Sequence, residues 1–153
     1  MSTLNDQHIK VLNSLVEVTL DSALGYKEAA KDAKNLRFKS LFEKRWVERN
    51  QLTAELQAEV RNLGGKPEDE GSVLGSAHRL FLNLKNAVTG SDQGVVNEVE
   101  AGEDHIKAKF ETALERENLP APVKGVVAKL YAVIKADHDQ MSDLKHDLRA
   151  RNA

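Results

Sequence analysis

The chain contains no cysteine. Disulfides, thiolate nucleophiles, iron–sulfur clusters and cysteine-ligated zinc sites are therefore excluded. Aromatic residues make up only 5% of the sequence, and runs of β-branched residues are few, so strands are not expected. The 3 prolines all lie where helices are expected to begin or end. These scarcities favour an all-α protein.

Long hydrophobic runs are missing too. No segment approaches the roughly 20 apolar residues of a membrane-spanning helix, and the first residues, MSTLNDQHIK, include no apolar stretch of signal-peptide length. The net charge is −2, from 24 acidic and 22 basic residues, and no block of basic residues is present. Phosphate binding needs clustered lysine and arginine. We therefore expect a soluble, cytoplasmic protein with neither a membrane nor a nucleic acid as partner.

What is present is a helical pattern throughout. At 153 residues, with 41% hydrophobic and 30% charged residues, the chain suits one domain with a buried core. Apolar residues at helical spacing predict helices at about 6–34, 36–63, 72–88, 93–117 and 121–149. The short first connection favours an antiparallel hairpin. Gly64-Gly65 is expected to end the second helix, because glycine accepts the left-handed backbone of a C-cap.

These segments predict an all-α bundle of four main helices with a shorter helix in the connection. If that short helix belongs to a long connection between two antiparallel pairs, the helices at 36–63 and 93–117 run parallel. An ordinary up-and-down bundle with one extra helix would give the same sequence pattern, so both topologies stay open.

Four stretches carry a family resemblance: LNSLVEVTLDSALGYKEAA (12–30), LFEKRWVERNQLTAELQAEVRNLGG (41–65), GSAHRLFLNLKNAVTG (75–90) and GEDHIKAKFETAL (102–114). Together the four resemble a bacterial, mostly proteobacterial, family of ferritin-like four-helix-bundle proteins that has no established activity. The match covers roughly residues 4–117, and the last helix is less distinctive. The resemblance implies a ferritin-like up-down bundle. It carries over no functional residues, although many members of the wider ferritin-like group bind two irons.

Charged residues on core-facing stripes are the least routine feature of the chain. Arg45 falls inside the apolar stripe of the second helix, Glu48 lies on its border, and Glu103 lies in the middle of the stripe of the fourth. Buried charges persist only when they are paired. We therefore favour a buried ion pair or hydrogen-bond cluster formed by Arg45, Glu48 and Glu103.

A metal site is the alternative interpretation. Dinuclear iron sites in helical bundles use a lone glutamate on each of two helices and Glu-x-x-His on the other two. Here Gln51 stands where Glu48 would need a histidine, and Lys135 stands three residues before His138. Only Glu48, Glu103 and His138 are expected to face one another. Three such ligands would suit one metal, such as iron, in a metal-binding protein or oxidoreductase, but not a dinuclear centre.

Two further expectations concern packing. Leu20, Leu24, Trp46 and Leu82 fall away from the predicted core stripes and, if adjacent, would form a surface for a homo-oligomer or a protein partner. Gly102 interrupts a helix, and we expect a neighbouring backbone to approach it closely. No nucleophile–base pair and no phosphate-binding loop is recognisable. The sequence thus favours a structural or interaction protein with no catalytic residues and no cofactor.

Overall fold

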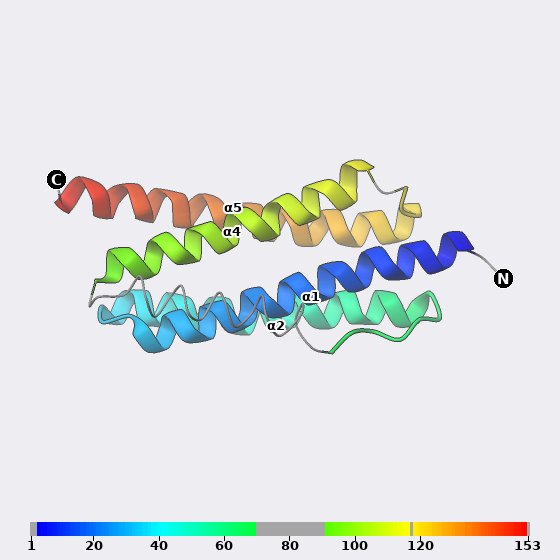
Figure 1. Ribbon diagram of the computed structural model, residues 1–153, viewed down its shortest axis with the longest axis horizontal. Coiled ribbons are helices and arrows are strands. Elements are labelled where there is room, and N and C mark those ends of the chain that lie inside the picture. Colours follow the sequence, from blue (N-terminus) through cyan, green and yellow to red (C-terminus); the bar gives the residue numbers. More distant parts are fainter. Residues whose placement is uncertain (1–2, 70–90, 117, 153) are drawn as a thin grey trace.

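The computed structural model describes residues 3–69, 91–116 and 118–152, and all regular secondary structure in these ranges is α-helical (Figure 1). The helices are α1 (Thr3–Asp32), α2 (Leu36–Asn62), α4 (Asp92–Arg116) and α5 (Ala121–Asn152). They agree with four of the five predicted segments. The short helix predicted at 72–88 lies outside the described residues. Among the helices described, none has the length and apolar character needed to cross a membrane.

The ends of α2 follow directly from its sequence. Asn35 is the N-cap, and its side chain accepts a hydrogen bond from the backbone N–H of Arg37 at 2.8 Å. At the other end the N–H of Gly65 donates to the carbonyl of Val60, and the N–H of Gly64 donates to that of Arg61. This is the Schellman arrangement, and it needs the left-handed backbone that Gly64 adopts with φ +85°. The predicted glycine stop is confirmed.

The start of α1 differs from expectation. The helix begins at Thr3, ahead of the start predicted at about residue 6. Asn5 donates a hydrogen bond from its side chain to the carbonyl of Leu63 at 2.8 Å, which ties the start of α1 to the end of α2.

Hydrogen bonds at the two ends of the bundle fix the directions of the helices. His8, near the start of α1, bonds through its ring to the carbonyl of Asn118, between α4 and α5. At the opposite end, Asp92 accepts hydrogen bonds from the backbone N–H groups of Lys34 and Asn35, so α4 begins where α2 begins. α2 and α4 therefore run parallel, and α1 and α5 run in the other direction (Figure 1). Of the two topologies that the sequence left open, this is the one with a long connection between two hairpins.

The hydrophobic core is divided into two clusters. One lies toward the end of the bundle where α1 begins and includes Leu12, Leu15, Val16, Leu52, Leu56, Ile106, Phe110, Val127, Leu130 and Ile134. The other lies toward the opposite end and includes Tyr26, Ala29, Ala30, Ala33, Phe42, Val95, Val96, Val99 and Met141. The backbones of α1 and α2 approach each other closely along their length, whereas α2 and α5 make few close approaches. Long side chains can therefore be accommodated between α2 and α5.

Two packing expectations are corrected. Leu20 and Trp46 are partly buried and pack against the two core clusters, and Leu24 is partly buried as well, so they do not form an exposed patch. These residues lie at the flanks of the core stripes, which a four-helix bundle still covers. Leu82 lies outside the described residues. At Gly102 an added Cβ would meet nothing within 4 Å, so the expected close backbone approach is absent among the described residues.

Candidate functional site: a buried ion-pair layer

A layer of charged side chains separates the two hydrophobic clusters, and Arg49 of α2 lies at its centre. The Arg49 side chain is 0% exposed. Its Nη2 atom donates to one carboxylate oxygen of Glu103 on α4 at 2.9 Å, and its Nη1 atom lies 2.9 Å from the other oxygen, so the ion pair is bidentate. The same guanidinium donates to Asp137 on α5 at 3.0 Å and to the hydroxyl of Ser22 on α1 at 2.8 Å. One side chain thus joins all four described helices.

Arg45 lies one turn earlier on α2 and completes the layer. Its Nε is 3.1 Å from the carboxylate of Asp137, and its guanidinium also donates to the amide oxygen of Gln140. Glu48 places one carboxylate oxygen 4.0 Å from the Nε of both Arg45 and Arg49, too far for a hydrogen bond but close enough for charge attraction. We call Arg45, Glu48, Arg49, Glu103 and Asp137 the ion-pair layer.

Helical spacing carries these side chains inward. Arg45 and Arg49 follow Phe42 and precede Leu52 and Leu56 at intervals of three and four residues, so all five lie on one face of α2. In the same way Glu103 lies between Val99 and Ile106, and Asp137 between Ile134 and Met141, and all six of these residues are buried. The wide separation of α2 and α5 leaves room for two arginine side chains to reach across.

The layer holds two guanidinium groups and three carboxylates, so it carries one excess negative charge if all are ionised. Burial raises the pKa of Glu48 from its ordinary 4.5 to about 7, helped by a hydrogen bond that protonated Glu48 donates to Asp137 and by the negative charge of Asp137. The charges of Arg45 and Arg49 act in the opposite direction. Burial alone would lower the pKa of Arg49, but the charge of Glu103 outweighs it, and the net direction is upward. Arg49 is therefore permanently charged, and Glu48 is the group that holds a proton near neutrality.

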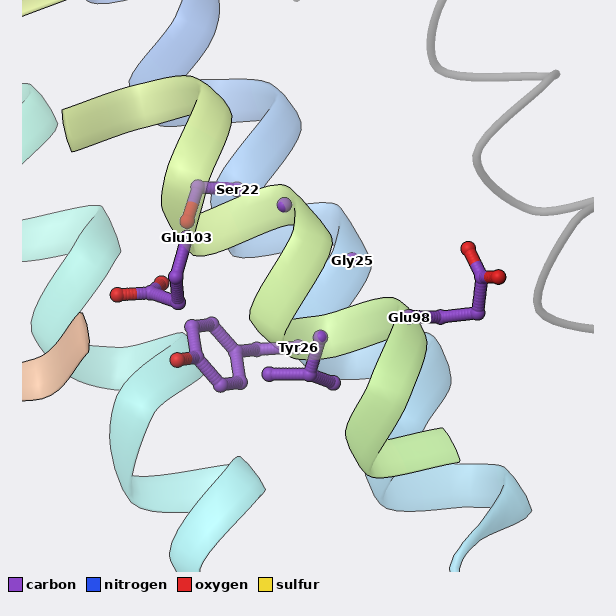
Figure 2. A pocket seen from close by; sticks show the side chains of 7 residues that line it. Ser22, Gly25, Tyr26, Glu98 and Glu103 are labelled. Carbon is purple, nitrogen blue, oxygen red and sulfur yellow. The ribbon is translucent and has the colours of Figure 1, made fainter. Parts of the chain in front are cut away.

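A cavity of about 30 Å³ between α1 and α4 reaches this layer. Ser22, Tyr26 and Glu103 are among its lining residues, and Figure 2 shows Tyr26 and Glu103 directed to the same side, whereas Glu98 points away. The Tyr26 ring also lies under the Arg49 guanidinium, with 5.4 Å between the Cζ atom and the ring centroid. Burial, and then the charge of Glu103, raise the pKa of Tyr26 well above 10. The cavity has room for only one or two water molecules, so it is too small for an organic substrate.

The residues named from the sequence occupy two separate places. Arg45 is buried and lies near Glu48, but Glu103 pairs with Arg49 rather than with Arg45. His138 is elsewhere: its ring nitrogens bond to Asp104 and Asp139. The structure therefore divides the candidate metal set of Glu48, Glu103 and His138, because Asp137 and not His138 occupies the inward position of α5.

Sequence reasoning missed Arg49, which has the most partners in the layer, and Asp137, which pairs with both arginines. The sequence did contain the evidence for an inward position, since Arg49 on α2 and Asp137 on α5 each lie three or four residues from apolar core residues of the same helix. Both are charged residues at positions where an apolar one is the default expectation. A strict reading of the spacing would have found them.

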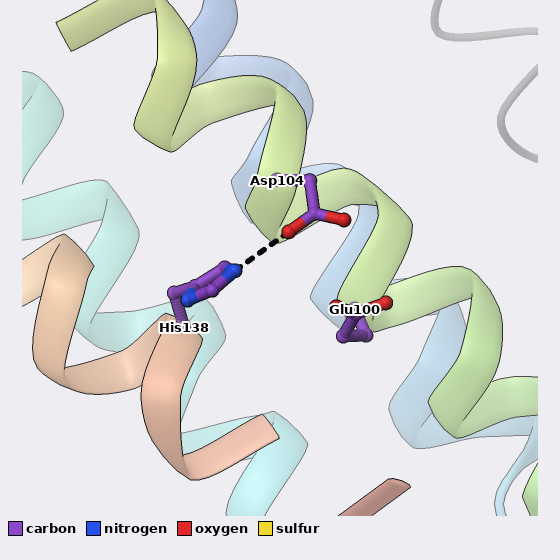
Figure 3. A group of neighbouring side chains, drawn as sticks. All are labelled: Glu100, Asp104 and His138. Atoms are coloured by element: carbon purple, nitrogen blue, oxygen red, sulfur yellow. Dashed lines mark hydrogen bonds and ion pairs between the residues drawn. The ribbon is translucent and has the colours of Figure 1, made fainter. Parts of the chain in front are cut away.

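One group of potential metal ligands does converge in the described part of the chain. Glu100 and Asp104 on α4 and His138 on α5 have ligand atoms within 4.8 Å of one another (Figure 3). The Nε2 atom of His138 lies 2.6 Å from a carboxylate oxygen of Asp104. This group lies on the outer seam of α4 and α5 and shares only His138 with the set named from the sequence.

Two antiparallel hairpins and a core divided by paired charges define the class: a helical bundle with an internal ion-pair layer. More particularly, the chain belongs to the family described as a domain of unknown function, DUF2383, whose profile matches residues 7–116. The match includes α1, α2 and α4 and stops before α5. A comparison with curated proteins finds no match.

Proposed function

We propose that this protein is a cytoplasmic structural or interaction protein of the ferritin-like kind, in which an ion-pair layer stands where a dinuclear iron centre would lie. The observation that carries the proposal is Arg49, which is 0% exposed and bonded to carboxylates from both α4 and α5. A guanidinium is permanently cationic and uses the oxygen lone pairs that a metal would need. Its position also repels a second cation.

The topology supports the ferritin-like part of the proposal. Parallel α2 and α4, joined by one long connection, is the arrangement of ferritin-like bundles. The layer lies midway along the helices: its members come from α2, α4 and α5, and Ser22 of α1 accepts a hydrogen bond from it. Carboxylates are retained on α2, α4 and α5, but each of them faces a guanidinium group.

Iron binding tests the proposal. The protein is purified without chelators, Fe(II) is added in air, and bound metal and oxygen consumption are measured. We expect no uptake of two irons per chain and no oxygen consumption above that of buffer. The control is Glu103→Gln, which removes a carboxylate from the centre but keeps its shape. Stoichiometric iron that is lost in Glu103→Gln would overturn the proposal.

Exposed apolar residues on α2 support an interaction role. Leu36 is 75% exposed and Val47 is 52% exposed. Eleven residues are close to three helical turns, so the two lie on one side of the helix. We propose that the protein forms a homo-oligomer through this side of α2. Light scattering should show an assembly that Val47→Glu weakens, and a monomer at high concentration would contradict this part of the proposal.

A further inference from the structure

The seam between α4 and α5 brings together three side chains of the types that bind metals. Glu100 and Asp104 are four residues apart, so they lie on the same face of α4. His138 faces them from α5, and the ligand atoms of the three residues all lie within 4.8 Å of one another (Figure 3). They form a group that the ion-pair layer does not use.

We propose that Glu100, Asp104 and His138 bind one divalent transition-metal ion of the zinc type. The class of metal follows from the ligands, since imidazole and carboxylate together suit Zn²⁺ and its first-row neighbours, whereas Mg²⁺ and Ca²⁺ prefer all-oxygen sites. Three protein ligands would leave a coordination position for water. This proposal does not depend on the function proposed above.

The surroundings of His138 orient it for this role. The Nδ1 atom lies 3.0 Å from the carboxylate of Asp139, which leaves Nε2 directed at Asp104. A carboxylate bonded to the far nitrogen of a histidine is the usual outer-shell support of a metal ligand. The side chains of His138 and Glu100 are only 16% and 12% exposed, so neither is a freely moving surface group.

The Asp104 side chain can move to shorten the distances between the three proposed ligands. Metal–ligand distances near 2.1 Å require ligand atoms roughly 3–3.5 Å apart. The present separations reach 4.8 Å, so some must shorten. The Asp104 side chain is 57% exposed and can rotate. Rotation of this side chain can bring its carboxylate closer to the other two ligands.

Nearby lysines oppose metal binding and therefore provide a test. Lys145 pairs with Glu100 at 3.0 Å, Lys135 pairs with Asp139 at 2.8 Å, and Lys107 pairs with Glu111 at 3.1 Å. Of these lysines, only Lys145 contacts a proposed ligand. A metal ion must displace Lys145 or share Glu100 with it, so removal of this one cation should strengthen binding.

Calorimetric titration of the full-length, chelator-stripped protein with Zn²⁺ tests the site. We expect one saturable site per chain. His138→Ala and Asp104→Asn should each raise the dissociation constant at least about tenfold, and Lys145→Met should lower it. The matched control is His146→Ala, because His146 is also on α5 but bonds to the backbone carbonyl of Ser142. Circular dichroism confirms that each variant is folded.

Three results would overturn the proposal. The first is the absence of saturable Zn²⁺ binding by the wild-type protein. The second is binding that His138→Ala and Asp104→Asn leave unchanged, and the third is an equal loss in His146→Ala. The outcome is separate from that of the iron experiment, because metal bound at this seam would persist in Glu103→Gln and be lost in His138→Ala.

Discussion

At the scale of single residues, Arg49 has the most consequential environment in the protein. A guanidinium group removed from water loses several kcal/mol of hydration, and only excellent partners offset that loss. Arg49 has them: a bidentate pair with Glu103, a hydrogen bond to Asp137 and another to Ser22. The surrounding carboxylates are buried as well, so each depends on the arginine as much as the arginine depends on them.

Removal of Arg49 should therefore be costly. Arg49→Ala leaves the buried Glu103 without its main partner, and we expect the free energy of unfolding to fall by about 3–5 kcal/mol. Urea denaturation monitored by circular dichroism measures it. Arg37→Ala, an exposed arginine on the same helix, should change stability by less than about 0.5 kcal/mol. Equal losses in the two variants would show that the burial of Arg49 has no energetic weight.

Glu48 gives the protein a pH-dependent stability. Its pKa is about 7 in the folded state against an ordinary 4.5, because burial and Asp137 disfavour the charged form. The folded state therefore binds the proton more tightly than the unfolded state. The stabilising contribution is complete below about pH 4.5 and is lost as the pH rises to about 7. Because 26% of the side chain is exposed to water, we expect a loss of about 1–2 kcal/mol.

Glu48→Gln isolates this effect, since glutamine resembles the protonated acid. Denaturation midpoints from pH 4.5 to 8 should show a smaller decline for Glu48→Gln than for the wild type. Glu43→Gln, an exposed carboxylate on α2, should follow the wild-type curve. Parallel curves for Glu48→Gln and the wild type would contradict the assignment of the proton to Glu48.

The sequence predicted buried charges in the middle of the bundle, but it grouped Glu103 with Arg45, whereas the structure pairs Glu103 with Arg49. Arg45 and Glu103 were recognised because they interrupt apolar stripes. Their partners depend on helix rotation and on the distance between α2 and α5, which no local pattern encodes. Asp137 and His138 are adjacent on α5, so an error of one residue in the predicted inward position exchanges one for the other. With Asp137 inward the charges form an ion-pair layer, whereas His138 inward would have added a metal ligand.

At the scale of helices, the local sequence predicts where a helix ends far better than it predicts how buried charges pair. The Asn35 cap and the Gly64-Gly65 stop of α2 both depend on residues within one turn of the helix end, so they could be read directly. The start of α1 could not, because Asn5 bonds to Leu63, which is 58 residues away in sequence. Long-range contacts override local capping preferences there.

Replacing a glycine by alanine should have opposite effects on stability at Gly102, within α4, and at Gly64, just after α2. An added Cβ at Gly102 meets nothing within 4 Å, and alanine favours a helix over glycine by about 1 kcal/mol. Gly102→Ala should therefore raise the melting temperature. Gly64→Ala should lower it, because φ is +85° there and a Cβ strains that conformation. Scanning calorimetry of both variants checks the signs, and a destabilised Gly102→Ala would mean that this site is closely packed after all.

At the scale of the whole molecule, two hairpins are held in register by a charged layer between two hydrophobic clusters. The clusters are non-directional and would tolerate sliding of one hairpin against the other. The ion-pair layer does not, since Arg49 reaches its partners on α1, α4 and α5 from a single position on α2. The sequence left the direction of α4 open, because no local pattern shows at which end of the bundle the long connection after α2 delivers the chain.

Arg49 and Glu103 hold the bundle together only if they are energetically coupled, and a double-mutant cycle measures that coupling most directly. The free energy of unfolding is determined for the wild type, Arg49→Met, Glu103→Gln and the double variant. We predict a coupling of about 2–3 kcal/mol, with the double variant less destabilised than the sum of the two single changes. Additivity within about 0.5 kcal/mol would contradict the claim that this pair holds the bundle together.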